Sequence, residues 1–312
     1  MNEIAPVLVI FWKRVEPFQQ VINQIRKVKP STLLFYQDGP RNTDDINDIM
    51  QCRKLIEKID WGCQIITHFN EHNIGCDPNV YNAIKWAFSH VDKCIILEDD
   101  CIVDETYFRF ATELLEKYES NEKINMICSL NVEQESNIKE DYFYCKRGNT
   151  WGWATWKRVI DNWNDNYEAV NQPELIKGIR KQFPTNSSYK HYIKRYRQHA
   201  KQHIAYHEYI NSMQQYTHDQ FNIIPRSNMV ENVGTTKDAT HFTSDIKLLS
   251  KDERKIMNLR KQSISFPLVH PKTICNNAQY DKKLVVDKYI LLRRKLERGF
   301  LKVRHKILSF KI

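Results

Sequence analysis

The sequence predicts an α/β protein built on a mostly parallel, doubly wound sheet. Over the first 130 residues, short apolar runs alternate with longer segments whose apolar residues recur at helical spacing, which is the pattern of consecutive β/α units. The chain has 312 residues, enough for one large α/β domain with additions.

The predicted strands are short runs rich in apolar and β-branched residues, as expected for strands buried in a parallel sheet. They cover residues 7–11, 32–36, 63–67, 94–97 and 124–130. Asp38, Gly39 and Pro40 form a turn signal directly after the second run.

The predicted helices lie between these runs, at residues 16–28, 44–59, 79–88 and 108–118. In the first helix, Phe18, Val21, Ile22 and Ile25 fall on one face. Because each strand is followed by a helix, neighbouring strands are expected to run parallel.

Beyond about residue 131 the regular alternation stops. Residues 185–218 are rich in His, Tyr, Lys and Gln, and they are expected to form helix and loop around a site and not a second core. Residues 225–241 are expected to form an irregular polar loop.

Three consecutive acids, Glu98, Asp99 and Asp100, follow the apolar run at 94–97. Ligands of open α/β sheets bind outside the carboxyl ends of the strands, and hard oxygen ligands there suit Mg²⁺ or Mn²⁺ with a phosphate-bearing substrate. The alternative is a solvated acidic turn that opens the next helix, although Asp104 and Glu105 already supply charge to that helix start.

Composition limits the function classes. With 8 glycines, the chain has no glycine-rich phosphate loop, so a metal and side chains would have to neutralise a bound nucleotide.

The 8 cysteines lack zinc-ligand spacing, and we expect reduced thiols in a cytoplasmic protein without signal peptide or membrane span. The net charge of +9 comes without a nucleic-acid-binding motif, so no nucleic-acid partner is expected.

A tryptophan-rich segment lies at residues 149–156. Trp151, Trp153 and Trp156 could form a platform for a sugar ring, because aromatic faces pack against the apolar faces of sugars. The alternative is ordinary aromatic core.

Five segments occur in an order that resembles a known family. They are residues 7–14, residues 35–39, residues 97–100 with Phe108, residues 151–156, and residues 228–234 with 238–241. Over about residues 6–245 the chain resembles a bacterial GT-A glycosyltransferase, which has a Rossmann-like fold, and is similar to the N-acetylglucosaminyltransferase I family.

The resemblance implies a donor site in the first half of the chain. Asp100 resembles the metal-binding acid of that family's DxD motif and would hold Mn²⁺ or Mg²⁺. Asp38 resembles the aspartate that contacts the nucleotide base, and Arg14 the arginine that contacts the donor. Asp99 would contact the ribose or the sugar, and Glu98 would orient the site.

The resemblance also implies an acceptor side and a catalytic base. Trp151 and Trp153 lie in the segment that resembles the acceptor-side Gly-Trp segment. Where relatives carry a Trp-Asp pair, this chain has Glu208 preceded by His207, and either side chain could accept the proton. His241 would reach the diphosphate or the metal, or serve as a structural loop histidine.

The implied activity is metal-dependent, inverting transfer of a sugar from a UDP-type nucleoside diphosphate to a hydroxyl of a glycan or lipid-linked acceptor, as in surface polysaccharide synthesis. Residues 1–250 would form the GT-A domain, with a nucleotide-sugar half at 1–130 and a helical and loop acceptor half at 131–250. Two alternatives are a metal-dependent phosphotransferase or phosphatase, and a non-enzymatic protein that binds membrane surfaces.

The remaining residues, 251–312, would form a C-terminal extension with a basic amphipathic helix. Its apolar stripe consists of Leu292, Leu296, Phe300, Val303 and Ile307, and cations populate much of the rest. Such a helix is expected to lie on an anionic leaflet, here the inner face of the plasma membrane. The alternative is a helix packed on the sheet domain with a solvated basic face.

Overall fold

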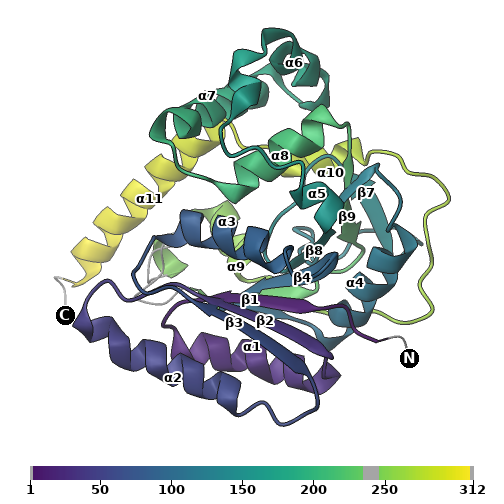
Figure 1. Ribbon diagram of the computed structural model, residues 1–312. Helices are drawn as coiled ribbons and strands as arrows, with labels where there is room; N and C mark the ends of the chain where they lie inside the picture. The colour runs from purple at the N-terminus through teal and green to yellow at the C-terminus, as the bar shows by residue number, and fades with distance from the viewer. Residues whose placement is uncertain (1–2, 235–245, 310–312) are drawn as a thin grey trace.

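The computed structural model describes residues 3–234 and 246–309. Its centre is an eight-stranded sheet in the order β3-β2-β1-β4-β8-β6-β9-β7 (Figure 1). The strands are β1 (Val7–Phe11), β2 (Thr32–Gln37), β3 (Gln64–Phe69), β4 (Lys93–Glu98), β6 (Ile124–Cys128), β7 (Tyr142–Cys145), β8 (Trp153–Trp156) and β9 (Phe221–Pro225). A separate antiparallel pair is formed by β5 (Cys101–Val103) and β10 (Val230–Asn232).

Helices lie on both faces of the sheet. The α-helices are α1 (Val15–Val28), α2 (Ile46–Glu57), α3 (Cys76–Ala87), α4 (Glu105–Lys117), α5 (Lys157–Ile160), α6 (Pro173–Gly178), α7 (Asn186–Gln202), α8 (His207–Thr217), α9 (Lys251–Met257), α10 (Ala278–Lys283) and α11 (Lys288–Ser309). Short 3₁₀ turns are η1 (Thr43–Asp45), η2 (Glu168–Asn171), η3 (Ile179–Gln182) and η4 (Ile246–Leu248).

The sheet is mostly parallel, as predicted. Strands β3, β2, β1 and β4 run parallel to one another, and β6 runs parallel to β9. The sequence did not predict β8, which lies antiparallel between β4 and β6, nor the antiparallel edge strand β7. Both are four-residue strands outside the regular alternation, so periodicity carries little signal for them.

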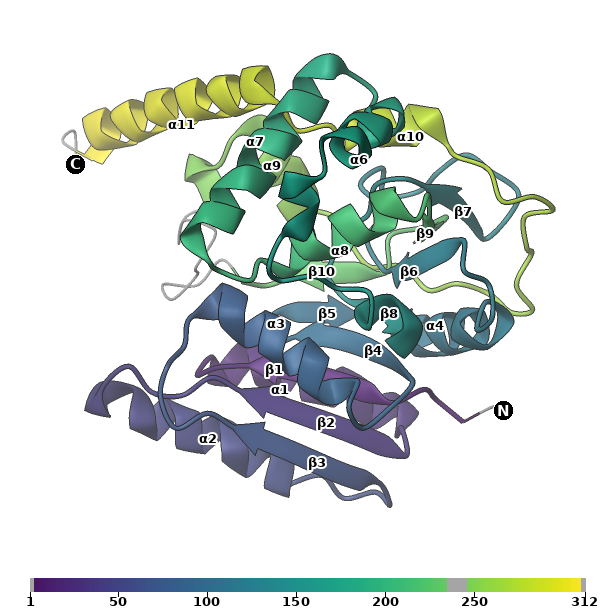
Figure 2. The ribbon, with the colours of Figure 1, turned by 45° about the horizontal axis from the view of Figure 1, so that its top comes forward.

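Alternating side chains of the strands enter two cores. In β1, Val7, Val9 and Phe11 join the core under α1, α2 and α4, whereas Leu8 and Ile10 join the core under α3, α7 and α8. Successive side chains of a strand point to opposite faces of the sheet. Because both faces are covered here, every position of the strand is apolar. Figure 2 shows the two helical layers on either side of the sheet.

The second half of the chain contributes to the second core. Residues 185–218 form helices, as predicted, but the expectation that they stay outside a core is wrong: Tyr192, Tyr196, Ile210 and Met213 are buried in it. A tyrosine can bury its ring while its hydroxyl keeps a partner, and the Tyr192 hydroxyl lies 2.9 Å from Ser212 Oγ.

The C-terminal residues pack against both cores before the last helix begins. Leu259, Ile264 and Leu268 belong to the first core and Tyr280 to the second. Helix α11 then runs past α7 and away from the sheet (Figures 1 and 2). Within residues 3–234 and 246–309, no helix combines the length and apolarity that crossing a bilayer requires.

Candidate functional site

The topology creates one position where a ligand site is expected. Strand β1 lies between β2 and β4, so the chain builds the sheet outward from β1 through β2 and β3 and then returns to its other side with β4. At such a switch point the loops after neighbouring strands diverge and leave room for a ligand. Arg14 follows β1, and Asp99 and Asp100 follow β4, so the predicted residues come together there.

A single guanidinium bridges two of the acids. Arg14 Nη1 donates to Asp100 Oδ2 at 2.8 Å, Arg14 Nε donates to Asp99 Oδ2 at 3.3 Å, and Nη2 pairs with Asp99 Oδ1. The backbone N–H of Trp12 also donates to Asp99, at 3.3 Å. Burial alone would lower the pKa of Arg14, but the charges of Asp99 and Asp100 outweigh it and raise that pKa.

The cluster keeps an excess of negative charge. Burial, followed by the charges of Asp100 and Asp99, raises the pKa of Glu98 to about 8, although Arg14 acts in the opposite direction. The charge of Glu208 makes a smaller contribution to this rise. Arg14 therefore bonds two of the three consecutive acids, and Glu98 receives only its longer-range Coulomb attraction.

The short pair of β10 and β5 brings a distant segment onto Asp100. The backbone N–H of Val233 donates to the Asp100 carbonyl at 3.0 Å, and Asn232 Nδ2 donates to Asp100 Oδ1 at 3.3 Å. Gly234 lies so close that a Cβ there would collide with Asp100 Oδ2. Residues 225–241 were expected to form an irregular polar loop; instead β10 forms within them, a strand too short for periodicity to detect.

The acidic cluster fits a divalent cation as part of a substrate complex. Its charge excess favours a cation, and the Asp100 side chain is 14% exposed at the rim of the cluster. No group of three or more His, Cys, Asp or Glu side chains suited to a metal occurs within the described part of the chain. Asp100 would therefore supply part of the coordination shell and a bound diphosphate and water the rest, as Mg²⁺ commonly requires.

The two candidate bases differ in position. Glu208, in the first turn of α8, is exposed, and its Oε1 accepts a hydrogen bond from Thr150 Oγ1 at 3.2 Å. His207 precedes it but is only 7% exposed, with its side chain turned into the protein. Of the two, Glu208 is the one that lies open to a substrate.

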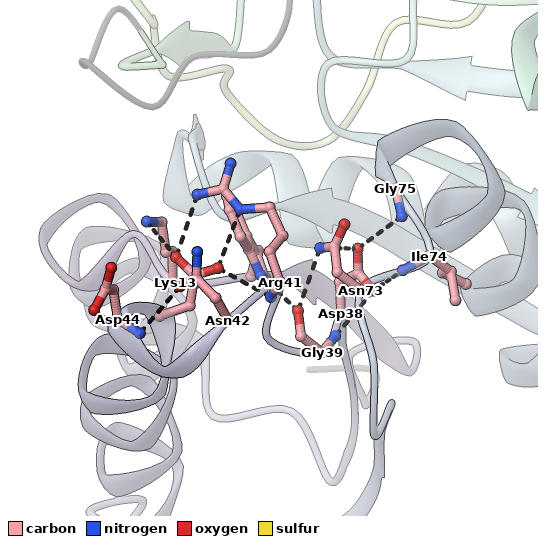
Figure 3. A network of polar contacts seen from close by, with 11 residues as sticks. Lys13, Asp38, Gly39, Arg41, Asn42, Asp44, Asn73, Ile74 and Gly75 are labelled. Atoms are coloured by element: carbon pink, nitrogen blue, oxygen red, sulfur yellow. Dashed lines mark hydrogen bonds and ion pairs between the residues drawn. The ribbon is translucent and has the colours of Figure 1, made fainter.

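Asp38 has a structural role that the sequence did not indicate (Figure 3). Its carboxylate accepts hydrogen bonds from Asn73 Nδ2 at 2.7 Å and from the backbone N–H groups of Ile74 and Gly75 at 2.9 and 3.2 Å. It also accepts from the Gly39 N–H at 2.9 Å. Asp38 therefore fastens the loop before α3 to the end of β2, and the role in base recognition stays a prediction.

A second polar network adjoins Asp38 in Figure 3 and was missed at the sequence level. Asp45 accepts hydrogen bonds from Arg41 and from Lys13 Nζ at 2.7 Å. Hydrogen bonds from Arg41 in particular hold the pKa of Asp45 below its usual value. The Arg41 guanidinium also lies over the Trp12 ring, 4.3 Å from its centroid. Arg41 is four residues from Asp45 and Lys13 is more than thirty residues away, so no local motif in the sequence predicts this cluster.

The tryptophan platform is only partly compatible with the structure. Trp153 is 2% exposed, because β8 lies inside the sheet between β4 and β6, so it is a core residue and cannot stack on an acceptor as predicted. Trp151 is half-buried and packs against the first core. Trp153 belongs to the second core, so the two indoles lie in different environments; Gly152 between them has a φ of 63°, which favours glycine. His241 lies outside the described residues.

Comparisons with known proteins give no family. No family model and no curated protein matches the chain. The crystal structure of HddC from Yersinia pseudotuberculosis complexed with GMP-PN aligns at 13% identity and a TM-score of 0.32, over 51% of this chain and 80% of that one. The structure of UDP-glucose pyrophosphorylase complexed with UDP-glucose aligns at 9% identity and a TM-score of 0.36, over 72% and 91%. Likeness at this level carries no information about the activity.

The placement of Trp153 leads to a stability prediction. Trp153→Ala is expected to lower the free energy of unfolding by about 3–5 kcal/mol, because it empties a fully buried site, whereas Trp153→Phe keeps most of the stability. Urea denaturation measures both. A Trp153→Ala protein as stable as wild type would contradict the core placement.

The network of Asp38 leads to a second prediction. Asp38→Asn is expected to lower the free energy of unfolding by about 1–3 kcal/mol, because the new amide group faces the N–H groups of Ile74 and Gly75. Asp44→Asn, an exposed acid nearby, is the control and should change little. Unchanged stability together with lost UDP affinity would instead assign Asp38 to base recognition.

Proposed function

We propose that this chain is a metal-dependent, inverting glycosyltransferase. It moves a sugar from a nucleoside diphosphate, of the UDP type, to a hydroxyl of a glycan or lipid-linked acceptor in surface polysaccharide synthesis. The observation that carries the proposal is the bridge from Arg14 to Asp99 and Asp100 at the switch point of the sheet. The exposed carboxylate of Glu208, which is bonded to Thr150, supplies a candidate base. The order of motifs that resembles the N-acetylglucosaminyltransferase I family supports it.

The donor half must stabilise a departing diphosphate. A divalent cation held by Asp100 would act there as a Lewis acid. Arg14 is partly exposed and carries a permanent charge, so it can pair with a diphosphate oxygen while keeping its bonds to Asp99. Asp99, which is 2% exposed and bonded to Arg14 and Trp12, would orient the arginine and, through it, the donor.

The acceptor half must take a proton from the attacking hydroxyl. Glu208 is open to that side, and Thr150 orients its carboxylate with a hydrogen bond. A carboxylate held in this way can act as general base toward an acceptor hydroxyl. In this proposal a single base deprotonates the acceptor hydroxyl, which attacks the sugar carbon on the side opposite the leaving diphosphate. Such a single displacement inverts the configuration of the transferred carbon.

The test is release of UDP from a panel of UDP-sugars in the presence of Mn²⁺ and candidate acceptors. Glu208→Gln is expected to lower kcat by roughly 10²–10⁴-fold with little change in donor affinity, because it removes proton transfer and keeps the side-chain shape. His207→Gln serves as the matched neighbour and should retain most of kcat.

Two outcomes would contradict the proposal. If His207→Gln loses turnover while its thermal unfolding stays unchanged, and Glu208→Gln stays active, the base is His207. If inorganic phosphate is released without any acceptor, and no sugar is transferred, the chain is a phosphatase or phosphotransferase.

A further inference from the structure

Helix α11 has a packed face and an open face. Ile290, Arg294, Glu297, Arg298 and Leu301 are partly buried, and in a helix these positions share one side. Arg298 pairs with Glu253 of α9, and Arg293 pairs with Asp252. The helix is therefore fastened to the body along one defined face.

The opposite face is a row of exposed apolar side chains. Leu292 is 56% exposed, Leu296 66%, Phe300 69% and Val303 60%. They recur at steps of four and three residues, so they form one continuous stripe pointing away from the protein. Four large apolar side chains left in water along one helix mark an interaction surface and not ordinary surface composition.

The charges along the helix are almost all positive. Among the side chains that the structure describes, its cations are Lys288, Arg293, Arg294, Lys295 and Arg298, against the single acid Glu297. If two copies of the chain paired through this stripe, the positive charges of their α11 helices would lie close together and repel. A partner that complements both the apolar stripe and the positive charges must offer an anionic surface with an apolar phase directly beneath it.

Helix α7, which α11 contacts, also carries a row of cations. Lys190, Lys194, Arg197 and Lys201 recur at steps of four and three residues and line a hollow of about 590 Å³. The hollow is also lined by Ile176, Tyr189 and Ile193, of which the two isoleucines are buried, whereas the cations are exposed. Exposed cations beside apolar side chains suit the phosphate and glycerol region of a lipid headgroup.

We propose that α11 and α7 form a docking surface for an anionic lipid bilayer. The α11 stripe enters the boundary between headgroups and acyl chains, and the α7 cations pair with lipid phosphates. A nucleic acid satisfies the charges but offers no apolar phase to the leucine and phenylalanine side chains. The proposal is independent of the transferase proposal, because it can be measured with neither donor nor acceptor present.

The first experiment is flotation of the full chain with vesicles of phosphatidylcholine alone or of equal parts phosphatidylglycerol and phosphatidylcholine. The wild-type chain is expected to float with the anionic vesicles, and to stay at the bottom of the gradient when the vesicles are neutral. Leu296→Ser with Phe300→Ser is expected to weaken partitioning about tenfold or more. Ile46→Ser with Met50→Ser, which removes exposed apolar side chains of α2, is the matched control.

The second experiment tests the share of α7. Lys190→Gln with Lys194→Gln is expected to weaken partitioning about fivefold for each cation removed, and more steeply as salt rises. Lys54→Gln with Lys58→Gln, one in α2 and one directly after it, removes the same charge from another surface and should leave partitioning unchanged.

Three results would overturn the proposal. One is equal flotation of the Leu296→Ser, Phe300→Ser chain and wild type. Another is equal flotation with neutral and anionic vesicles. The third is a wild-type dimer in sedimentation velocity that the stripe variant converts to monomer while flotation is unaffected, which would assign the stripe to a second copy of the chain.

Discussion

The ion pairs of Arg14 with Asp99 and Asp100 hold the site together, because they join the ends of β1 and β4 at the switch point of the sheet. Two adjacent carboxylates in a partly buried position would repel each other without a cation between them. The guanidinium has several fixed donors and can bridge both acids at once, which an ammonium group does poorly. The remaining features of the site are arranged around this bridge.

The single positive charge of Arg14 does not neutralise the three acids, and the remaining negative charge makes the cluster attractive to a cation. Glu98 has a pKa raised to about 8, so the cluster lowers its charge by holding a proton more tightly than a free carboxylate does. A divalent cation arriving with a diphosphate would relieve the same repulsion. The strand β10 encloses the cluster from another direction, with Asn232 and Gly234 against Asp100.

The sequence was most informative where structure is local. The apolar runs at 7–11 and 94–97 and the helical spacing of Phe18, Val21 and Ile25 predicted the parallel half of the fold, and Asp104 does cap α4 as its position suggested. The acids after β4 could be assigned to a ligand-binding edge because strand polarity alone places them there.

The missed features depend on contacts between distant residues. Trp153 became core because β8 inserts between β4 and β6, and nothing within four residues specifies that pairing. The role of Asp38 depends on Asn73, Ile74 and Gly75, more than thirty residues away. Which of His207 and Glu208 is exposed depends on how α8 is rotated against the core, and the sequence around these two residues does not define that rotation.

Calorimetric titration with UDP, with and without Mn²⁺, tests the central claim that the acids at the switch point receive a metal and a nucleoside diphosphate. Mn²⁺ is expected to tighten UDP binding by about tenfold or more in the wild-type chain. Asp100→Asn should lose this gain, whereas Asp161→Asn, a change at a surface acid, should keep it. UDP binding that is absent, or that is equally strong without Mn²⁺ and in Asp100→Asn, would contradict the account.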